Sequence, residues 1–231
     1  LSIITNISIE HTEFLGETIE EIAREKAGII KRKIPVVIGE RRNETERIFK
    51  EIALKRESKI FFASDYNYDF DHLIDVSYQK KNVKTALASL QFLSFLNLKK
   101  EDIENGLKKV KTNTSFIGRW QVLKKNPKII LDVSHNYEGF KNIIEQIKNE
   151  NFKRLIFVMG FVKRKNVKEI FSILPKRAFY FISKPKIDRG YPIEDIKIKL
   201  ESFSHNIIYS NSLKESYYKA VEISLKEDLI V

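Results

Sequence analysis

Short apolar runs alternate with amphipathic stretches through the first half of the chain. Runs rich in β-branched or aromatic residues predict buried strands, whereas apolar residues repeated at intervals of three and four predict helices with one buried face. The predicted strands are 1–8, 34–39 and 59–64, an extended segment is predicted over 69–77, and the predicted helices are 16–28, 43–58, 80–96 and 99–110.

Two of these helices permit more detailed predictions. Thr18 followed by Glu21 is a capping-box signature, so we expect the first helix to begin just after Thr18. Gly28 stands where a C-terminal cap belongs. In the second helix, the residues expected to face the core are Ile48, Ile52 and Leu54.

The alternation stops at residues 111–120 and then restarts. Polar residues followed by Gly118 are typical of a linker, so we predict two domains, 1–112 and 113–231. In the second domain the predicted strands are 128–134, 154–161, 178–183 and 206–210, and the predicted helices are 137–150, 166–175, 192–203 and 213–228. Strands that alternate with helices form βαβ units, which predicts an α/β fold with a mostly parallel sheet.

Composition places the chain among globular proteins. It has 231 residues, of which 42% are hydrophobic and 32% are charged, and it contains no cysteine. No apolar run approaches the roughly 20 residues of a membrane span, and no secretory signal opens the chain. We therefore expect a cytoplasmic protein without a membrane partner or a disulfide framework.

The formal net charge of +11 has three interpretations. A lysine-rich, solvated surface is the simplest one, and anionic small substrates or nucleic acid are the functional ones. No arginine-rich arm, zinc finger or aromatic RNA-binding motif accompanies the charge. We therefore expect no nucleic-acid partner.

The segment Asp132–Asn136 follows a predicted strand, at the edge of a parallel sheet where ligands bind. An aspartate at a strand end can accept hydrogen bonds from ribose hydroxyls. Ser134, His135 and the amides that open the next helix can approach phosphate. The alternative is that Ser134 or Asn136 simply caps the helix.

Other polar residues give weaker signals when taken one at a time. Thr5, Asn6 and then His11 follow the first strand, and a lone histidine there is more often exposed than a ligand. Arg119, beside the only tryptophan, could reach phosphates or pair with a carboxylate. His72 and His205 have no supporting neighbours, so we interpret them as structural or exposed.

Both ends of the chain look cut. The first residue is leucine within a predicted strand, and the last residues begin another strand. The sequence contains neither G-x-x-x-x-G-K-[ST] nor G-x-G-x-x-G. If the protein binds ATP, we expect the phosphate cradle to lie outside these residues.

Several segments in order resemble the folylpolyglutamate synthase and dihydrofolate synthase family of the Mur ligase superfamily. They are ITNISIEHTEFLGETIEEIAREKAGIIK (4–31), GRWQVL (118–123), PKIILDVSHNYEGF (127–140) and FVMGFVKRKNVKEIF (157–171). The resemblance implies a P-loop-type central ATPase domain followed by a Rossmann-like C-terminal domain. It also implies ATP-dependent addition of glutamate to dihydropteroate or folates through an acyl phosphate.

The resemblance implies a metal site and a nucleotide site. His11 matches a histidine that binds Mg²⁺, and Lys26 matches a lysine that CO₂ carbamylates, which would make it an oxygen ligand. Asp132 matches the ribose-binding aspartate. Arg119 matches an arginine that contacts ATP phosphate across an interdomain cleft. The remaining matches are His135, near the nucleotide, and Asn82, near adenine; the residues expected to be catalytic are Lys26, Arg119 and His135.

The sequence departs from the family pattern at three positions, where Glu10, Tyr78 and Tyr137 replace aspartate, histidine and proline. Because the family's P-loop would precede Leu1, we expect a monomeric C-terminal portion that is inactive alone. The alternatives are another Mur-type amide ligase and a non-catalytic nucleotide-binding module.

Overall fold

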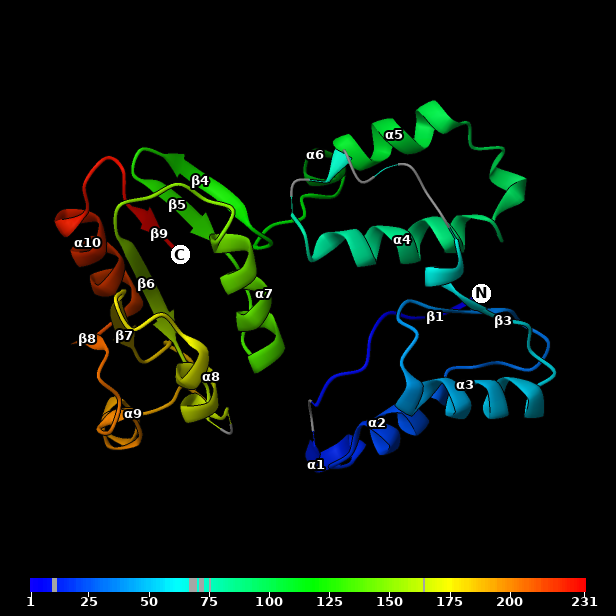
Figure 1. The fold of residues 1–231 in the computed structure, drawn as a ribbon, viewed down its shortest axis with the longest axis horizontal. Coiled ribbons are helices and arrows are strands. Elements are labelled where there is room, and N and C mark those ends of the chain that lie inside the picture. Colours follow the sequence, from blue (N-terminus) through cyan, green and yellow to red (C-terminus); the bar gives the residue numbers. More distant parts are fainter. Residues whose placement is uncertain (10–11, 67–69, 71–72, 75, 164) are drawn as a thin grey trace. The chain divides into compact units, whose positions relative to one another are not determined.

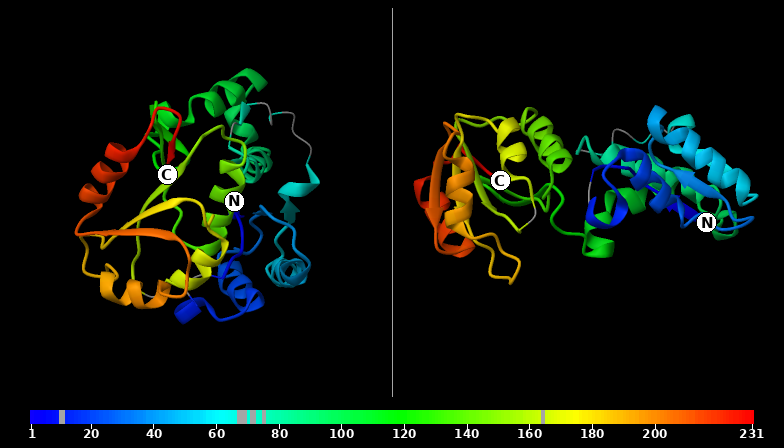
Figure 2. Two further views of the ribbon diagram at one scale, coloured as in Figure 1. Left: turned by 60° about the vertical axis from the view of Figure 1, so that its left-hand side comes forward. Right: turned by 90° about the horizontal axis from the view of Figure 1, so that it is seen from below.

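A computed structural model describes residues 1–9, 12–66, 70, 73–74, 76–163 and 165–231. The chain divides into two compact units, Leu1–Ser115 and Phe116–Val231, which are described separately (Figures 1 and 2). In the described ranges, no helix is long and apolar enough to cross a membrane.

The first unit is built on a three-stranded parallel sheet in the order β1-β2-β3. Its strands are β1 (Ser2–Ile4), β2 (Val36–Ile38) and β3 (Ile60–Phe62). Its helices are α1 (Thr12–Leu15), α2 (Ile19–Ala27), α3 (Asn43–Lys55), α4 (Gln79–Leu90), α5 (Lys100–Lys108) and α6 (Val110–Thr114), with the 3₁₀ turns η1 (Ala63–Asp65) and η3 (Ser94–Leu96).

Helices cover both faces of this sheet. Successive strand residues point to opposite faces, so Val36 and Ile38 join the core under α2 and α3, whereas Val37 packs against Ala88 of α4. Figure 1 shows α2 and α3 on one side of the strands and α4 on the other. The predicted capping box of α2 is confirmed, because Thr18 and Glu21 cap each other's backbone.

Three predictions for this unit are wrong in detail. Leu54 is 80% exposed, because it lies about 200° around the helix axis from Ile52, while Phe49 and Ala53 fill the core. The predicted helix 80–96 ends at Leu90, and Phe95 is exposed. Part of the expected linker is the helix α6. Much of the predicted extended segment 69–77, with His72, lies outside the described residues.

The second unit contains a six-stranded sheet in the order β4-β5-β9-β6-β7-β8. Only the β4–β5 pair is antiparallel, which confirms the predicted mostly parallel α/β architecture. Its strands are β4 (Gln121–Lys125), β5 (Lys128–Leu131), β6 (Leu155–Gly160), β7 (Phe179–Ser183), β8 (Asn206–Ser210) and β9 (Leu229–Ile230). Its helices are α7 (Tyr137–Ile147), α8 (Val167–Ile173), α9 (Ile193–Leu200) and α10 (Leu213–Ile223).

Different side chains pack on the two faces of this sheet. Phe181 packs with Ala220 of α10. On the opposite face, Tyr180 contacts Phe171 of α8, with 5.3 Å between ring centroids. His205 joins this aromatic cluster, and its Nε2 donates to the carbonyl of Leu174 at 3.1 Å. His205 is therefore a packing residue, as one of the two sequence interpretations proposed.

Candidate functional site

Asp132 holds two segments of the second unit together. It follows β5, and its Oδ1 accepts hydrogen bonds from the backbone amide of Ser134 at 2.9 Å and from the Ser134 hydroxyl at 2.7 Å. Its Oδ2 accepts from the backbone amide of Trp120 at 2.8 Å. The carboxylate thus joins the turn that carries Arg119 to the loop that carries His135.

The turn at Gly118 brings the chain close to the same loop. Gly118 has a φ of +74°, and its carbonyl accepts from the amide of Val133 at 2.9 Å. A Cβ at position 118 would lie 2.5 Å from Cγ1 of Val133, so any larger residue would push the two segments apart. Arg119 therefore lies beside the 132–136 loop within one rigid piece of backbone.

The side chains on this frame differ in how they are held. Nδ1 of His135 lies 3.1 Å from the carbonyl of Val133. Because a carbonyl only accepts, Nδ1 carries the proton of the neutral ring, which leaves Nε2 as an acceptor on an exposed side chain. The half-buried Arg119 makes no hydrogen bond or ion pair with any described residue.

The capping alternative is correct for Asn136 and wrong for Ser134. The Asn136 side chain accepts from the amide of Gly139 at 2.8 Å and begins α7. The Ser134 hydroxyl instead donates to Asp132. The start of α7 is therefore capped by Asn136 and by neither Ser134 nor His135.

In the first unit, Lys26 reaches back to the loop after β1. Its Nζ donates to the carbonyl of Asn6 at 3.3 Å, although the two residues are 20 positions apart. Helical side chains lean toward the helix N-terminus, which allows a lysine in the last turn of α2 to reach this loop. The metal-ligand candidate His11 lies outside the described residues, as does Glu10.

The carboxyl edge of the three-stranded sheet gathers further polar groups. A Cβ at Gly39, just after β2, would lie 2.2 Å from the carbonyl of Thr5 and 2.6 Å from the hydroxyl of Thr85 on α4. Lys81 of α4 pairs with Glu40 at 2.9 Å. The first turns of α4 are therefore held near the loop after β1.

Asn82, the candidate adenine contact, lies in the first half of α4. Its Nδ2 donates to Oε1 of Gln79 at 3.0 Å, and the side chain is exposed. The position is near the sheet edge, and the described structure gives the side chain a local role within the helix. No group of three His, Asp or Glu side chains in the described part of the chain could hold a metal ion.

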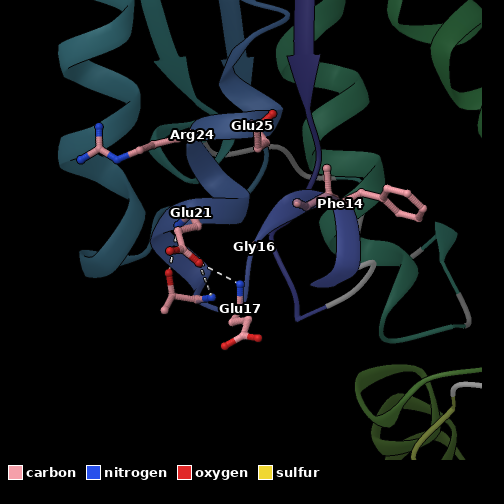
Figure 3. A pocket seen from close by; sticks show the side chains of 8 residues that line it. Phe14, Gly16, Glu17, Glu21, Arg24 and Glu25 are labelled. Carbon is pink, nitrogen blue, oxygen red and sulfur yellow. Dashed lines mark hydrogen bonds between the residues drawn. The ribbon is translucent and has the colours of Figure 1, made fainter.

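A shallow hollow of about 520 Å³ lies at the start of α2. Figure 3 shows Glu17, Glu21, Arg24 and Glu25 around it, with the Glu21 carboxylate turned back to the helix start. Hydrogen bonds from the backbone amides of Glu17 and Thr18 lower the pKa of Glu21. Three carboxylates against one guanidinium make this hollow a poor place for phosphate.

Sequence reasoning missed the backbone contacts that assemble both regions. Nothing in the sequence marked the amide of Trp120 as a partner of Asp132. The close approach at Gly39 had a weak signal, since a glycine directly after a strand often marks a near contact. Pattern analysis identified the candidate side chains and not the frame that holds them.

Comparisons with known proteins show what this chain is similar to. The family model described as Mur ligase, glutamate ligase domain, matches residues 118–231. A dihydrofolate synthase/folylpolyglutamate synthase of Buchnera aphidicola (subspecies Schizaphis graminum) is 30% identical over 249 residues, covering 100% of this chain. The chain spans 57% of the length of that relative.

Two solved structures share the fold over nearly the whole chain. E. coli FolC in complex with DHPP and ADP has a TM-score of 0.82 at 23% identity, covering 99% of this chain and 56% of its own. The bifunctional folylpolyglutamate synthase/dihydrofolate synthase of Yersinia pestis, complexed with AMPPNP and a Mn ion, has a TM-score of 0.81 at 23% identity, covering 99% and 57%. The predicted fold is confirmed.

Proposed function

We propose that this protein is an ATP-dependent amide ligase. The proposal starts from two similarities: residues 118–231 match the Mur ligase glutamate ligase domain family, and the whole chain is similar to dihydrofolate synthase/folylpolyglutamate synthases. Its acceptor is dihydropteroate, a folate or both, and its amine substrate is glutamate. The observation that carries the proposal is the hydrogen-bonded frame of Asp132, which presents Arg119 and His135 on one edge of the sheet.

The reaction overcomes the poor electrophilicity of a carboxylate. The acceptor carboxylate attacks the γ-phosphorus of ATP, ADP leaves, and an acyl phosphate forms. The glutamate amine then attacks the acyl carbon, phosphate leaves, and the amine proton is lost to a base. The residues of this chain must therefore bind a nucleotide and neutralise developing negative charge.

The second unit supplies the nucleotide-binding groups in this proposal. Asp132 receives donors at both oxygens, and it is proposed to accept a further hydrogen bond from a ribose hydroxyl. Arg119 has no partner among the described residues and donates to phosphate. His135 has an exposed side chain and is proposed to lie near the phosphates of the nucleotide. Asn82 is proposed to contact adenine.

His11 and Lys26 are the proposed ligands for Mg²⁺. The amine of Lys26 already points to the loop after β1, which leads toward His11. Carbamylation replaces the ammonium with an anionic oxygen donor, and oxygen donors suit a hard cation. The bound ion would neutralise phosphate charge.

The proposal is tested by phosphate release from ATP. The complete product of the gene that encodes this chain is assayed with glutamate and either dihydropteroate or tetrahydrofolate. We expect release that needs both glutamate and the acceptor, and that falls at least 100-fold in Lys26→Ala. The matched control is Lys31→Ala, an exposed lysine just beyond α2.

Two results of the phosphate-release assay would contradict the proposal. Release that persists in Lys26→Ala would remove the metal-site role of this lysine. No release with either acceptor would move the assignment to a Mur-type ligase of another substrate or to a non-catalytic nucleotide-binding module.

A further inference from the structure

Two basic loops follow neighbouring strands of the six-stranded sheet. We call residues 161–166, after β6, and 184–190, after β7, the basic double loop. Gly160 and Ser183 pair at the carboxyl ends of the parallel strands β6 and β7, so both loops leave the same edge of the sheet (Figure 1). The Asp132 loop leaves β5 at that edge too, because β5, β9 and β6 are parallel.

Backbone hydrogen bonds connect the two loops of the basic double loop. The amide of Lys163 donates to the carbonyl of Arg189 at 2.8 Å, and the amide of Tyr191 donates to the carbonyl of Phe161 at 2.8 Å. A Cβ at Gly190 would lie 2.5 Å from the carbonyl of Pro185, which makes the turn tight. These contacts hold the described residues of both loops side by side.

The charge on the described residues of these loops is unbalanced. Their described cations are Lys163, Lys165, Lys184, Lys186 and Arg189, and their one carboxylate is Asp188. None of the five cations makes an ion pair with a described residue. Elsewhere in the unit many lysines are paired, as in Lys219–Glu215 at 2.7 Å and Lys197–Glu194 at 2.9 Å.

We propose that the basic double loop binds the γ-linked glutamate tail of a polyglutamylated substrate. This inference rests on the proposed function, which supplies a substrate with a growing row of carboxylates. One free glutamate has two carboxylates, too few to use five cations spread over two loops. A tail gains one negative charge per residue added, and flexible lysine side chains can follow its length.

The test is direct binding of oligo-γ-glutamate to this chain, without ATP or turnover. Fluorescently labelled γ-linked peptides of one, three and six glutamates are titrated at two salt concentrations. We expect affinity to rise with peptide length and to fall as salt increases. The variant Lys163→Glu/Lys186→Glu is expected to weaken hexaglutamate binding at least tenfold.

A matched variant separates the site from total charge. Lys125→Glu/Lys226→Glu makes the same change in net charge on exposed lysines at the opposite edge of the sheet, and we expect it to change binding less than threefold. An equal loss in both variants would overturn the proposal. So would equal affinity for one and six glutamates, which would indicate a site for the free amino acid.

Nucleic acid is the competing polyanion. A single-stranded oligonucleotide that binds more tightly than hexaglutamate, and loses affinity in the same loop variant, would overturn the proposal. Since binding is measured without catalysis, failure here leaves the ligase assignment standing. If the ligase assay fails, the binding of oligo-γ-glutamate to the basic double loop can still be interpreted.

Discussion

At the scale of single residues, Asp132 has a structural role beside its proposed ribose contact. Its oxygens satisfy the amides of Trp120 and Ser134, which lie on separate segments. The sequence marked Asp132 as a nucleotide ligand because of its place after a strand. It did not mark the backbone partners, since these depend on how the turn at Gly118 folds.

We expect Asp132→Asn to destabilise the protein and to weaken ADP binding. The asparagine amide would point a donor at one of the backbone donors that the carboxylate now satisfies, which costs about 1–3 kcal/mol. Urea unfolding measures the stability, and titration of the folded variant with ADP measures the affinity. A variant with unchanged stability would contradict the hydrogen-bond frame.

A substitution at Ser216 is expected to raise the stability of the protein. This residue of α10 is fully buried, and its hydroxyl has no hydrogen-bond partner among the described groups. We expect Ser216→Ala to stabilise the protein by about 1 kcal/mol, because an unpaired hydroxyl is removed and alanine favours helix.

A control lies on the same helix. The Ser212 hydroxyl accepts from the amide of Glu215 at 3.1 Å and caps α10, so Ser212→Ala is expected to cost about 1 kcal/mol. Thermal unfolding of both variants gives the comparison. A loss of stability in Ser216→Ala would show that the buried hydroxyl has a partner.

At the scale of elements, the sequence predicted most strands and helices and missed those with weak apolar patterns. β4 is largely exposed, with the pattern QVLKK, so no buried strand was predicted there. The helix over 80–96 was drawn too long because apolar residues continue past Leu90. An apolar run shows that a segment can be buried and does not show where a helix ends.

Arg154 and Asp228 connect β6, the end of α10 and β9. Nε of Arg154 lies 3.1 Å from Oδ2 of Asp228, and the amide of Leu225 donates to the same oxygen at 2.7 Å. Burial alone would raise the pKa of Asp228, but the hydrogen bonds from Arg154 and Leu225 outweigh it and lower that pKa.

This lowered pKa predicts how stability depends on pH. The ionised Asp228 stabilises the fold above the unfolded-state pKa of about 3.9, and this contribution is lost as pH falls through the lower folded-state pKa. We expect Asp228→Asn to lower stability at pH 7 on the order of 2 kcal/mol and to flatten the loss of stability below pH 4. Urea unfolding across pH measures both.

The exposed Asp188 supplies the control for this prediction. Asp188→Asn makes the same chemical change on a carboxylate with no ion pair among the described residues. We expect its stability to stay within about 0.5 kcal/mol of the parent at pH 7. Equal effects of the two substitutions would contradict the role of the Arg154–Asp228 pair.

At the scale of the whole molecule, the order of the motifs along the chain supports the resemblance to the synthases more strongly than any single candidate site does. The segments that resemble the synthases span both units, and the relatives cover the same range. The net charge of +11 indicated no specific partner by itself. Only the structure shows that cations without an ion pair among the described residues lie on both the loop after β6 and the loop after β7, since those loops are distant in sequence.

Product formation tests the central claim most directly. The complete gene product is incubated with ATP, isotopically labelled glutamate and either dihydropteroate or tetrahydrofolate, and the products are analysed by mass spectrometry. The account predicts an acceptor that carries the labelled glutamate in amide linkage, formed only with ATP and absent in Lys26→Ala. ATP consumption without labelled product, or labelled product without ATP, would contradict it.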